Sequence, residues 1–211
     1  MTAMPDDRRR LDAAGAAALA GLAARVRELT EAAVLTGVDA AEAAAVAAEV
    51  AALTARLGAE RDGAPPFAAS PDGVRMDRQL ANPVTGPLNP LAPPIELEVT
   101  SDGIVRGEFT LGPVYEGPPS YVHGGVSAMV LDQVLGMAAA ATGTPGMTAS
   151  LELRYRRPTP LGVPLLAEAK ASRVEGRKVF ASGTIAAPDG RVTVEATALF
   201  VMPQRFVTSQ Y

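Results

Sequence analysis

The segment from Tyr115 to Asp132, YEGPPSYVHGGVSAMVLD, constrains the fold of this 211-residue chain more than any other stretch. Its adjacent prolines exclude a helix in the first half, and its adjacent glycines let another backbone or a ligand approach closely. From Val126 onward the residues are compatible with a helix and apolar around most of its circumference. We therefore expect a helix over about residues 125–141 that is buried rather than lying on the surface.

Asp132 is the first charged residue after His123, the single histidine of the chain. An idle carboxylate inside an apolar, buried helix would cost on the order of several kcal/mol. Asp132 is therefore the first candidate for chemistry. The alternatives without chemistry are a helix charge or an arginine partner for Asp132, and a structural hydrogen bond for His123.

From Ile95 onward the hydrophobic period changes to two, which is typical of β-strands. Turn sequences at Asp102–Gly103, Glu175–Gly176 and Asp189–Gly190 separate the alternating segments, and the last three segments predict a meander. With the apolar helix, this pattern predicts an α+β fold in which an antiparallel sheet wraps around one central helix. The predicted strands are residues 95–100, 104–112, 148–158, 163–175, 177–187 and 191–202.

The first 61 residues differ from the rest, because alanine, leucine, arginine and glutamate dominate them. They predict two helices, over about residues 8–35 and 39–58, with Gly37 closing the first and Asp39 capping the second. Such a hairpin could pack on a partner surface, or it could be a mobile, solubilising appendage. Residues 62–94 are rich in proline and glycine and predict an irregular linker, which leaves 95–211 as the main domain.

Composition excludes several classes of function. The chain has no cysteine and one histidine, so disulfides, thiolate nucleophiles and most zinc sites are excluded. The net charge of −4 argues against binding of nucleic acid. No uncharged apolar stretch approaches the roughly 20 residues that span a bilayer, and the start of the chain lacks a signal-peptide pattern. We therefore expect a cytoplasmic protein with no membrane span.

Four pieces of sequence together resemble the hotdog-fold acyl-CoA thioesterases, and within them the PaaI-like branch that includes the vertebrate thioesterase-superfamily members. They are the GPPSYVHGG loop, Asp132 on the following helix, Thr148 at the start of the next strand, and VEGRK at 174–178. The resemblance covers about residues 82–203. It implies hydrolysis of acyl-CoA to free coenzyme A and a carboxylic acid, without a metal or organic cofactor, by a homodimer or a dimer of dimers.

The expected chemistry needs hydrogen-bond donors at the thioester carbonyl and a base or nucleophile on the other side of its carbon. Backbone N–H groups of Gly124 and Gly125, at the helix start, are suitable donors. Asp132 lies eight residues further, or about 12 Å along the helix, so a site would combine two subunits. Asp132 would activate water or attack directly, Thr148 would position the water or the carboxylate, and His123 would shape the loop and contact substrate.

Basic residues predict contacts with the phosphates of coenzyme A. Strand alternation would place Arg154 and Arg156 on the same face as Thr148. Gly176, Arg177 and Lys178 of the VEGRK hairpin could approach the same phosphates, because arginine suits phosphate geometry. The alternative for such residues is a solvated strand end, which we prefer for Arg157 and Arg173.

Some relatives carry an asparagine or glutamine before HGG that helps to polarise the carbonyl. Here Gly117 occupies the position six residues before the histidine, so that donor is absent or comes from elsewhere, for example from Asn89 or Gln133.

Two other functions remain open on the same fold. A non-catalytic acyl-CoA binder would have little use for Asp132 and Thr148, and Thr148 could also be an ordinary strand threonine. A hydratase or dehydratase would normally use a histidine as base, whereas glycines beside His123 suit carbonyl polarisation better. The apolar helix and the 4% aromatic content favour an aliphatic acyl chain of medium or long length.

Overall fold

The computed structural model describes residues 9–68, 78–93 and 95–204 of the chain. Two compact units divide the chain, Met1–Leu91 and Ala92–Tyr211. Parts of the predictions above, namely residues 1–8, 69–77, 94 and 205–211, lie outside the described residues. None of the described helices is both long and apolar enough to cross a lipid bilayer.

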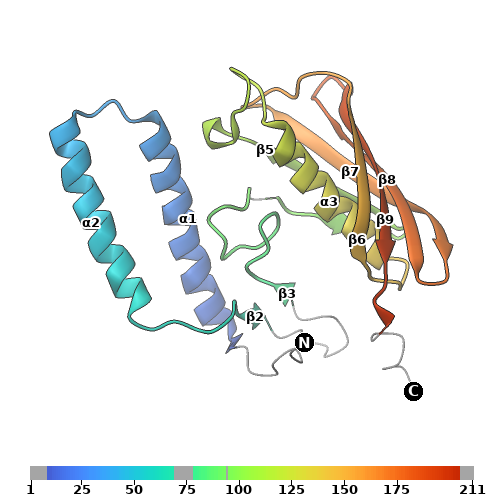
Figure 1. Cartoon of the computed structure of the whole chain (residues 1–211), viewed down its shortest axis with the longest axis horizontal. Helices are drawn as coiled ribbons and strands as arrows, with labels where there is room; N and C mark the ends of the chain where they lie inside the picture. The colour runs from blue at the N-terminus through green and yellow to red at the C-terminus, as the bar shows by residue number, and fades with distance from the viewer. Residues whose placement is uncertain (1–8, 69–77, 94, 205–211) are drawn as a thin grey trace. The chain divides into compact units, whose positions relative to one another are not determined.

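The second unit is a six-stranded sheet that packs against one helix, α3 (Figure 1). Every neighbouring pair of strands is antiparallel, in the order β4-β5-β7-β8-β9-β6. This confirms the predicted α+β architecture and the meander of the last three strands. The elements are β4 (Glu98–Val99), β5 (Ile104–Thr110), α3 (Gly124–Ala140), β6 (Met147–Tyr155), β7 (Pro164–Glu175), β8 (Lys178–Ala186) and β9 (Val192–Val201).

The first strand of this sheet is shorter than the sequence predicts. Residues 95–100 alternate in hydropathy, but only Glu98 and Val99 pair with β5. At the start of this segment the N–H of Ile95 donates to the carbonyl of Pro93 at 2.7 Å and is therefore not available to a neighbouring strand. Ile95 is nevertheless buried and belongs to the core.

Helix α3 buries one face rather than its whole circumference. Its fully buried residues recur at helical spacing and contact the concave side of the sheet; they are Ser127, Val130, Leu131, Val134, Leu135, Ala138 and Ala139. The opposite face carries Val126, Met129 and Met137, which stay half-buried, and Asp132 is half-buried as well. The predicted burial of this helix is therefore confirmed for the face toward the sheet, while the single chain leaves the other apolar face of α3 uncovered.

An irregularity in β6 changes which side chains share a face. The pairing between β6 and β9 shifts between Thr148 and Ser150, because Thr148 lies opposite Phe200 while Ser150 lies opposite Leu199. One extra residue therefore stands in β6, as in a β-bulge. Beyond the bulge Leu153 lies opposite the core residue Ala196, so the intervening residues that alternate with Leu153 point to the outer face of the sheet.

The first unit contains two long helices, α1 (Ala13–Leu35) and α2 (Ala40–Gly58). The Asp39 side chain accepts a hydrogen bond from the Glu42 N–H, which confirms the predicted N-cap. Helix α1 begins five residues later than predicted, because Asp12 caps it and β1 (Arg10–Leu11) precedes it. It ends in the extended residue Thr36 instead of a left-handed glycine, so the predicted closing role of Gly37 is wrong.

The predicted linker contains more structure than its composition indicates. β1 pairs with β2 (Phe67–Ala68), which pairs with β3 (Arg78–Gln79). Asn82 then forms a tight turn, because its side-chain oxygen accepts hydrogen bonds from the N–H groups of Val84 and Thr85. An asparagine followed by a proline favours such a turn, because the asparagine side chain bonds to backbone N–H groups two and three residues further on.

Candidate functional site

The start of α3 is organised by His123, which is its N-cap residue. The imidazole Nδ1 accepts a hydrogen bond from the Gly125 N–H at 3.0 Å, and the His123 carbonyl accepts from Val126 and Ser127. Because Nδ1 is an acceptor here, a neutral ring carries its proton on Nε2. The expectation of two free donors therefore changes: Gly125 already has an acceptor, while the Gly124 N–H has none among the described residues.

The loop before this helix is held by backbone hydrogen bonds. The N–H of His123 donates to the Tyr115 carbonyl, and the N–H of Gly117 donates to the Tyr121 carbonyl. A Cβ atom added at Gly117 would lie 2.7 Å from the Cα of His123. This position therefore has no room for an asparagine or glutamine side chain, which explains the missing donor. The alternative candidate Asn89 uses its side chain elsewhere, on the Ala81 carbonyl and the Leu91 N–H.

Tyr155, at the end of β6, also contacts the helix start and was not recognised from the sequence. Its hydroxyl donates to the Gly124 carbonyl at 2.9 Å. A Cβ atom at Gly124 would lie 3.2 Å from the same hydroxyl oxygen, so the glycine allows this close approach. A tyrosine in a strand carries no sequence signal of such a role; only the fold places its ring beside the helix.

Asp132 and Thr148 are brought together as the sequence motif suggested. The Thr148 hydroxyl donates to Asp132 Oδ1 at 2.9 Å, and this hydrogen bond joins the second residue of β6 to α3. The bulge after Thr148 directs its side chain toward α3 while Ser150 faces the other way. This bond fixes the carboxylate and leaves its other oxygen, Oδ2, available for a water or a substrate.

The two groups lie at opposite ends of β6. Thr148, with Asp132, is near the start of the strand, whereas Tyr155, with Gly124, is at its end. Eight helical residues separate Gly124 from Asp132, which corresponds to about 12 Å. One chain therefore holds two separate groups of candidate residues, one with an N–H donor that has no acceptor among the described residues and one with a carboxylate held by a hydroxyl.

The VEGRK hairpin lies at the same end of the sheet as Thr148. Lys178 of β8 is opposite Val201 of β9, which in turn is opposite Met147 of β6. Gly176 makes the turn with a φ of +57°, in the left-handed region that favours glycine. The Arg177 guanidinium donates to the Met202 carbonyl at 2.8 Å.

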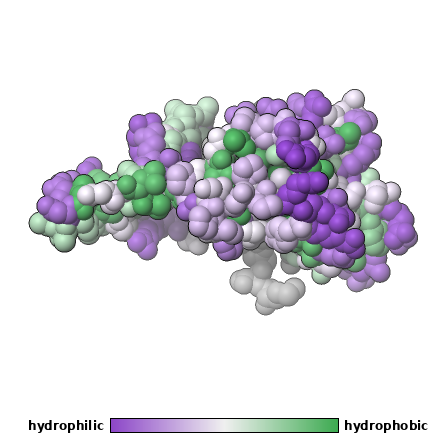
Figure 2. Space-filling model, turned by 90° about the horizontal axis from the view of Figure 1, so that it is seen from above, coloured by the Kyte–Doolittle hydropathy of each residue, from purple (hydrophilic) through white to green (hydrophobic). Residues whose placement is uncertain are grey.

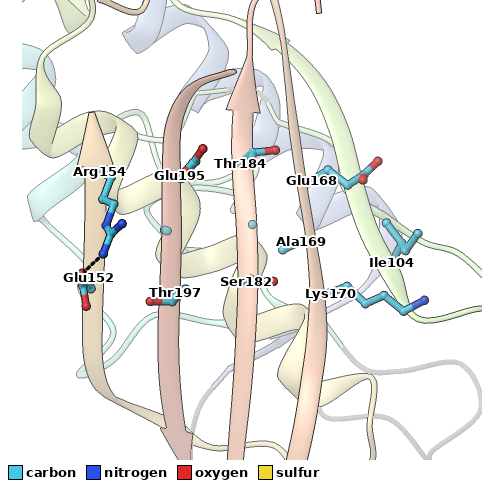
Figure 3. A pocket seen from close by; sticks show the side chains of 12 residues that line it. Ile104, Glu152, Arg154, Glu168, Ala169, Lys170, Ser182, Thr184, Glu195 and Thr197 are labelled. Atoms are coloured by element: carbon cyan, nitrogen blue, oxygen red, sulfur yellow. Dashed lines mark hydrogen bonds and ion pairs between the residues drawn. The ribbon is translucent and has the colours of Figure 1, made fainter. Parts of the chain in front are cut away.

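Arg154 and Arg156 do not share a face with Thr148, so the alternation argument for them is wrong. The bulge reverses the pattern, and Arg154 lies opposite Glu195 on the outer face of the sheet. There it lines an open groove of about 590 Å³ together with Glu152, Glu195 and Lys170 (Figure 3). Contact of these arginines with coenzyme A stays a prediction, without support from strand geometry.

The outer-face charges are largely paired with one another. Arg156 donates to Glu195 at 2.8 Å, and this hydrogen bond lowers the pKa of Glu195. Arg173 lies over the ring of Phe180 at 4.1 Å and pairs with Glu175 at 3.0 Å. Arg157 donates to the Val192 carbonyl. These contacts agree with the structural roles that we preferred for Arg157 and Arg173.

Comparison with known proteins identifies the family of the chain. Residues 120–201 match the family model described as Thioesterase superfamily. A crystal structure of a thioesterase superfamily protein is 42% identical, with a TM-score of 0.78 over 87% of this chain and 94% of that one.

Among curated proteins, acyl-coenzyme A thioesterase THEM4 of Xenopus laevis is 42% identical over 44% of this chain. The same protein of Mus musculus is 39% identical over 41% of this chain. The matches span 42% and 37% of the length of these relatives. The family model, the sheet wrapped around one helix and the likeness over 87% of the chain all indicate the same family. The protein therefore belongs to the thioesterase superfamily, with the hotdog fold.

Proposed function

We propose that the protein hydrolyses acyl-CoA thioesters to coenzyme A and a carboxylic acid. The observation that carries the proposal is the Asp132 carboxylate, held by the Thr148 hydroxyl at 2.9 Å on the half-exposed face of α3. The names of the THEM4 relatives, acyl-coenzyme A thioesterases, support the same reaction. A positioned carboxylate and a free N–H donor at a helix start are the two groups that thioester hydrolysis requires.

The active unit in this proposal is a dimer. β6 is an edge strand of the sheet, and the uncovered face of α3 beside it carries Val126, Met129 and Met137. A two-fold axis that pairs β6 with β6 of a second copy in antiparallel orientation brings the Tyr155 end of one strand to the Thr148 end of the other. Each complete site then combines the helix start of one subunit with Asp132 of the other.

In such a site the thioester carbonyl accepts a hydrogen bond from the Gly124 N–H, where the helix dipole also favours negative charge. Asp132 acts from the opposite side of the carbonyl carbon. It removes a proton from an attacking water, or its free Oδ2 attacks and forms a mixed anhydride that water then hydrolyses. In both routes the C–S bond breaks, coenzyme A leaves as the thiol, and the acyl group leaves as the acid.

The remaining site residues position the helix start and the substrate and take no part in bond making or breaking. His123 fixes the helix start through the Gly125 N–H, which leaves Gly124 as the carbonyl donor. Gly176, Arg177 and Lys178, at the Thr148 end of the sheet, are proposed to contact the phosphates of coenzyme A. The half-buried Met129 and Met137 are suited to line a channel for an aliphatic acyl chain.

The test is release of free thiol from a panel of aliphatic and aryl acyl-CoAs, measured for the wild type and for Asp132→Asn. The amide is nearly isosteric but can neither take a proton nor attack, so we expect a loss of about 10²–10⁴ in rate. Asp102→Asn, an exposed turn aspartate of the same unit, is the matched control and should keep the wild-type rate. Near-wild-type thiol release by a folded Asp132→Asn protein would contradict the role of Asp132 as base or nucleophile.

The same panel separates the other two functions. A pure acyl-CoA binder would bind the compounds without releasing thiol. A hydratase would add water to an enoyl-CoA and leave its thioester intact.

A further inference from the structure

Helix α2 is almost entirely exposed in the described chain. None of its 19 residues is buried, and it does not pack closely on α1, although the two run antiparallel in Figure 1. Isolated helices of this length are only marginally stable in water, and most helical stability in proteins comes from packing of an apolar face. Figure 2, which looks down on the connection between α1 and α2, shows hydrophobic residues uncovered on this hairpin among charged ones.

The apolar residues of α2 form a single stripe. Val46, Val50, Leu53 and Leu57 follow each other at spacings of four, three and four residues, the pattern of a coiled-coil seam. At about 100° per residue they fall within an arc of about 60°. Val46 is 39% exposed, Leu53 49% and Leu57 56%. Monomeric soluble proteins seldom leave such a continuous stripe open to water.

The charged residues of the helix all line one flank of this stripe. They are Glu42, Glu49 and Arg56, the only charged residues of α2. In the described part of the chain, neither Glu49 nor Arg56 makes an ion pair. On α1, Arg25 already pairs with Glu28 at 2.7 Å. The flank of α2 therefore carries charges of both signs without partners.

We propose that α2 packs antiparallel against α2 of a second copy of this chain. About a two-fold axis, Val46 then meets Leu57 of the other copy, and Val50 meets Leu53, so that every layer is apolar on both sides. The same arrangement brings Glu49 beside Arg56 of the other copy, twice by symmetry. A parallel pair would instead place these charges opposite alanine or threonine and Arg56 near Arg61.

A pair of 19-residue helices buries less surface than the roughly 1,200–2,000 Å² that a stable protein interface buries. The contact therefore forms between copies that another interface already holds together, where the effective concentration is high. The inference does not rest on thioesterase chemistry, because α2 lies outside both halves of the candidate site.

Disulfide cross-linking tests the pairing directly, because the chain has no cysteine of its own. Val50→Cys and Leu53→Cys copies, carrying different tags, are co-expressed and oxidised. We expect a mixed cross-linked dimer. The matched control joins Ala48→Cys with Ala55→Cys, which lie at the mirrored heights on the opposite face of the helix and should cross-link at least about tenfold less. Circular dichroism checks that each variant keeps its helix.

A charge exchange on the same cysteine variants identifies the partner. Glu49→Arg creates two repulsive pairs and should slow the mixed cross-link about fivefold, as expected for exposed ion pairs. Glu49→Arg combined with Arg56→Glu should restore the wild-type rate, because the exchange is self-complementary only between two copies of α2. Three results would overturn the proposal: no mixed cross-link, equal cross-linking of the control face, or a double exchange that fails to restore the rate.

Discussion

At the start of α3, the His123 imidazole occupies one of two neighbouring backbone N–H donors. His123 accepts the Gly125 N–H through Nδ1, whereas the Gly124 N–H has no acceptor in the described structure. Because an unpaired donor at a helix start favours an anionic oxygen, we expect Gly124 to act in the proposed site through its backbone N–H. Substitutions of Gly124 and Thr148 test this donor and the hydroxyl that holds Asp132.

Gly124→Pro should remove the donor while keeping the helix. Proline is tolerated at the first helical position, and the ψ of 131° at His123 suits a following proline. We expect thiol release to fall by about 10²–10³ relative to Gly124→Ala. The alanine variant places a similar Cβ near Tyr155 but keeps the N–H, so the comparison isolates the donor. Equal rates for both variants would exclude a role for this N–H.

Thr148→Val should lower kcat by about 10- to 100-fold with little effect on KM, because a hydrogen bond to a charged group is lost while the shape is kept. Thr148→Ser keeps the hydroxyl and should stay near the wild-type rate. Steady-state kinetics on one acyl-CoA check both values. A valine variant as active as the serine variant would show that the 2.9 Å bond to Asp132 has no part in turnover.

At the scale of elements, β6 connects the two halves of the site. Thr148, the second residue of this strand, points toward α3, and Tyr155, the last residue, donates to the Gly124 carbonyl at the helix start. The bulge between Thr148 and Ser150 allows this while the following residues still alternate between core and outer face. The strand is therefore an edge of the sheet that also positions both groups of the proposed site.

Tyr155→Phe removes the hydrogen bond that ties β6 to the start of α3. The free energy of unfolding should fall by about 1 kcal/mol, and kcat/KM should fall several-fold as the helix start loosens. Tyr121→Phe is the matched control, because the Tyr121 hydroxyl forms no hydrogen bond with the described residues. Urea unfolding and thiol release measure the two effects. If both variants behaved alike, the bond from Tyr155 would be structurally idle.

The strands of the six-stranded sheet and the central helix were predictable because period-two alternation and helical apolar spacing are local patterns, whereas the Asp132–Thr148 contact was expected from the resemblance to a family. That Thr148 and Arg154 lie on opposite faces was not predictable, since simple alternation puts them in phase and the extra residue after Thr148 reverses that relation. Tyr155 was missed for a related reason: its role depends on which element folds beside it. The two-residue strands β1 to β3 are shorter than any pattern can indicate.

At the scale of the whole molecule, the single chain contains a donor at one end of β6 and a carboxylate at the other. In the proposed dimer, each site takes one half from each subunit. The matches to THEM4 cover 41–44% of this chain. The likeness to the solved thioesterase superfamily protein covers 87%, so it reaches into the N-terminal unit.

Mixing Asp132→Asn subunits with Gly124→Pro subunits should regain activity, although each variant alone is inactive. In a mixed dimer one site receives an intact helix start and an intact carboxylate, and the other receives neither. We expect up to about half of the wild-type activity per mixed dimer. Subunit exchange is verified by differently tagged copies. Mixed dimers without activity would show that each site is built within one chain.

In the proposed dimer, the position of the two half-sites at opposite ends of one edge strand also ties turnover to protein abundance. Assembly creates the sites themselves, so diluting the protein below its dissociation constant would remove catalytic centres rather than merely spread them out. Under those conditions the rate would scale with the square of the chain concentration. Expression level would then set not only how much catalyst a cell holds but what fraction of it is able to work.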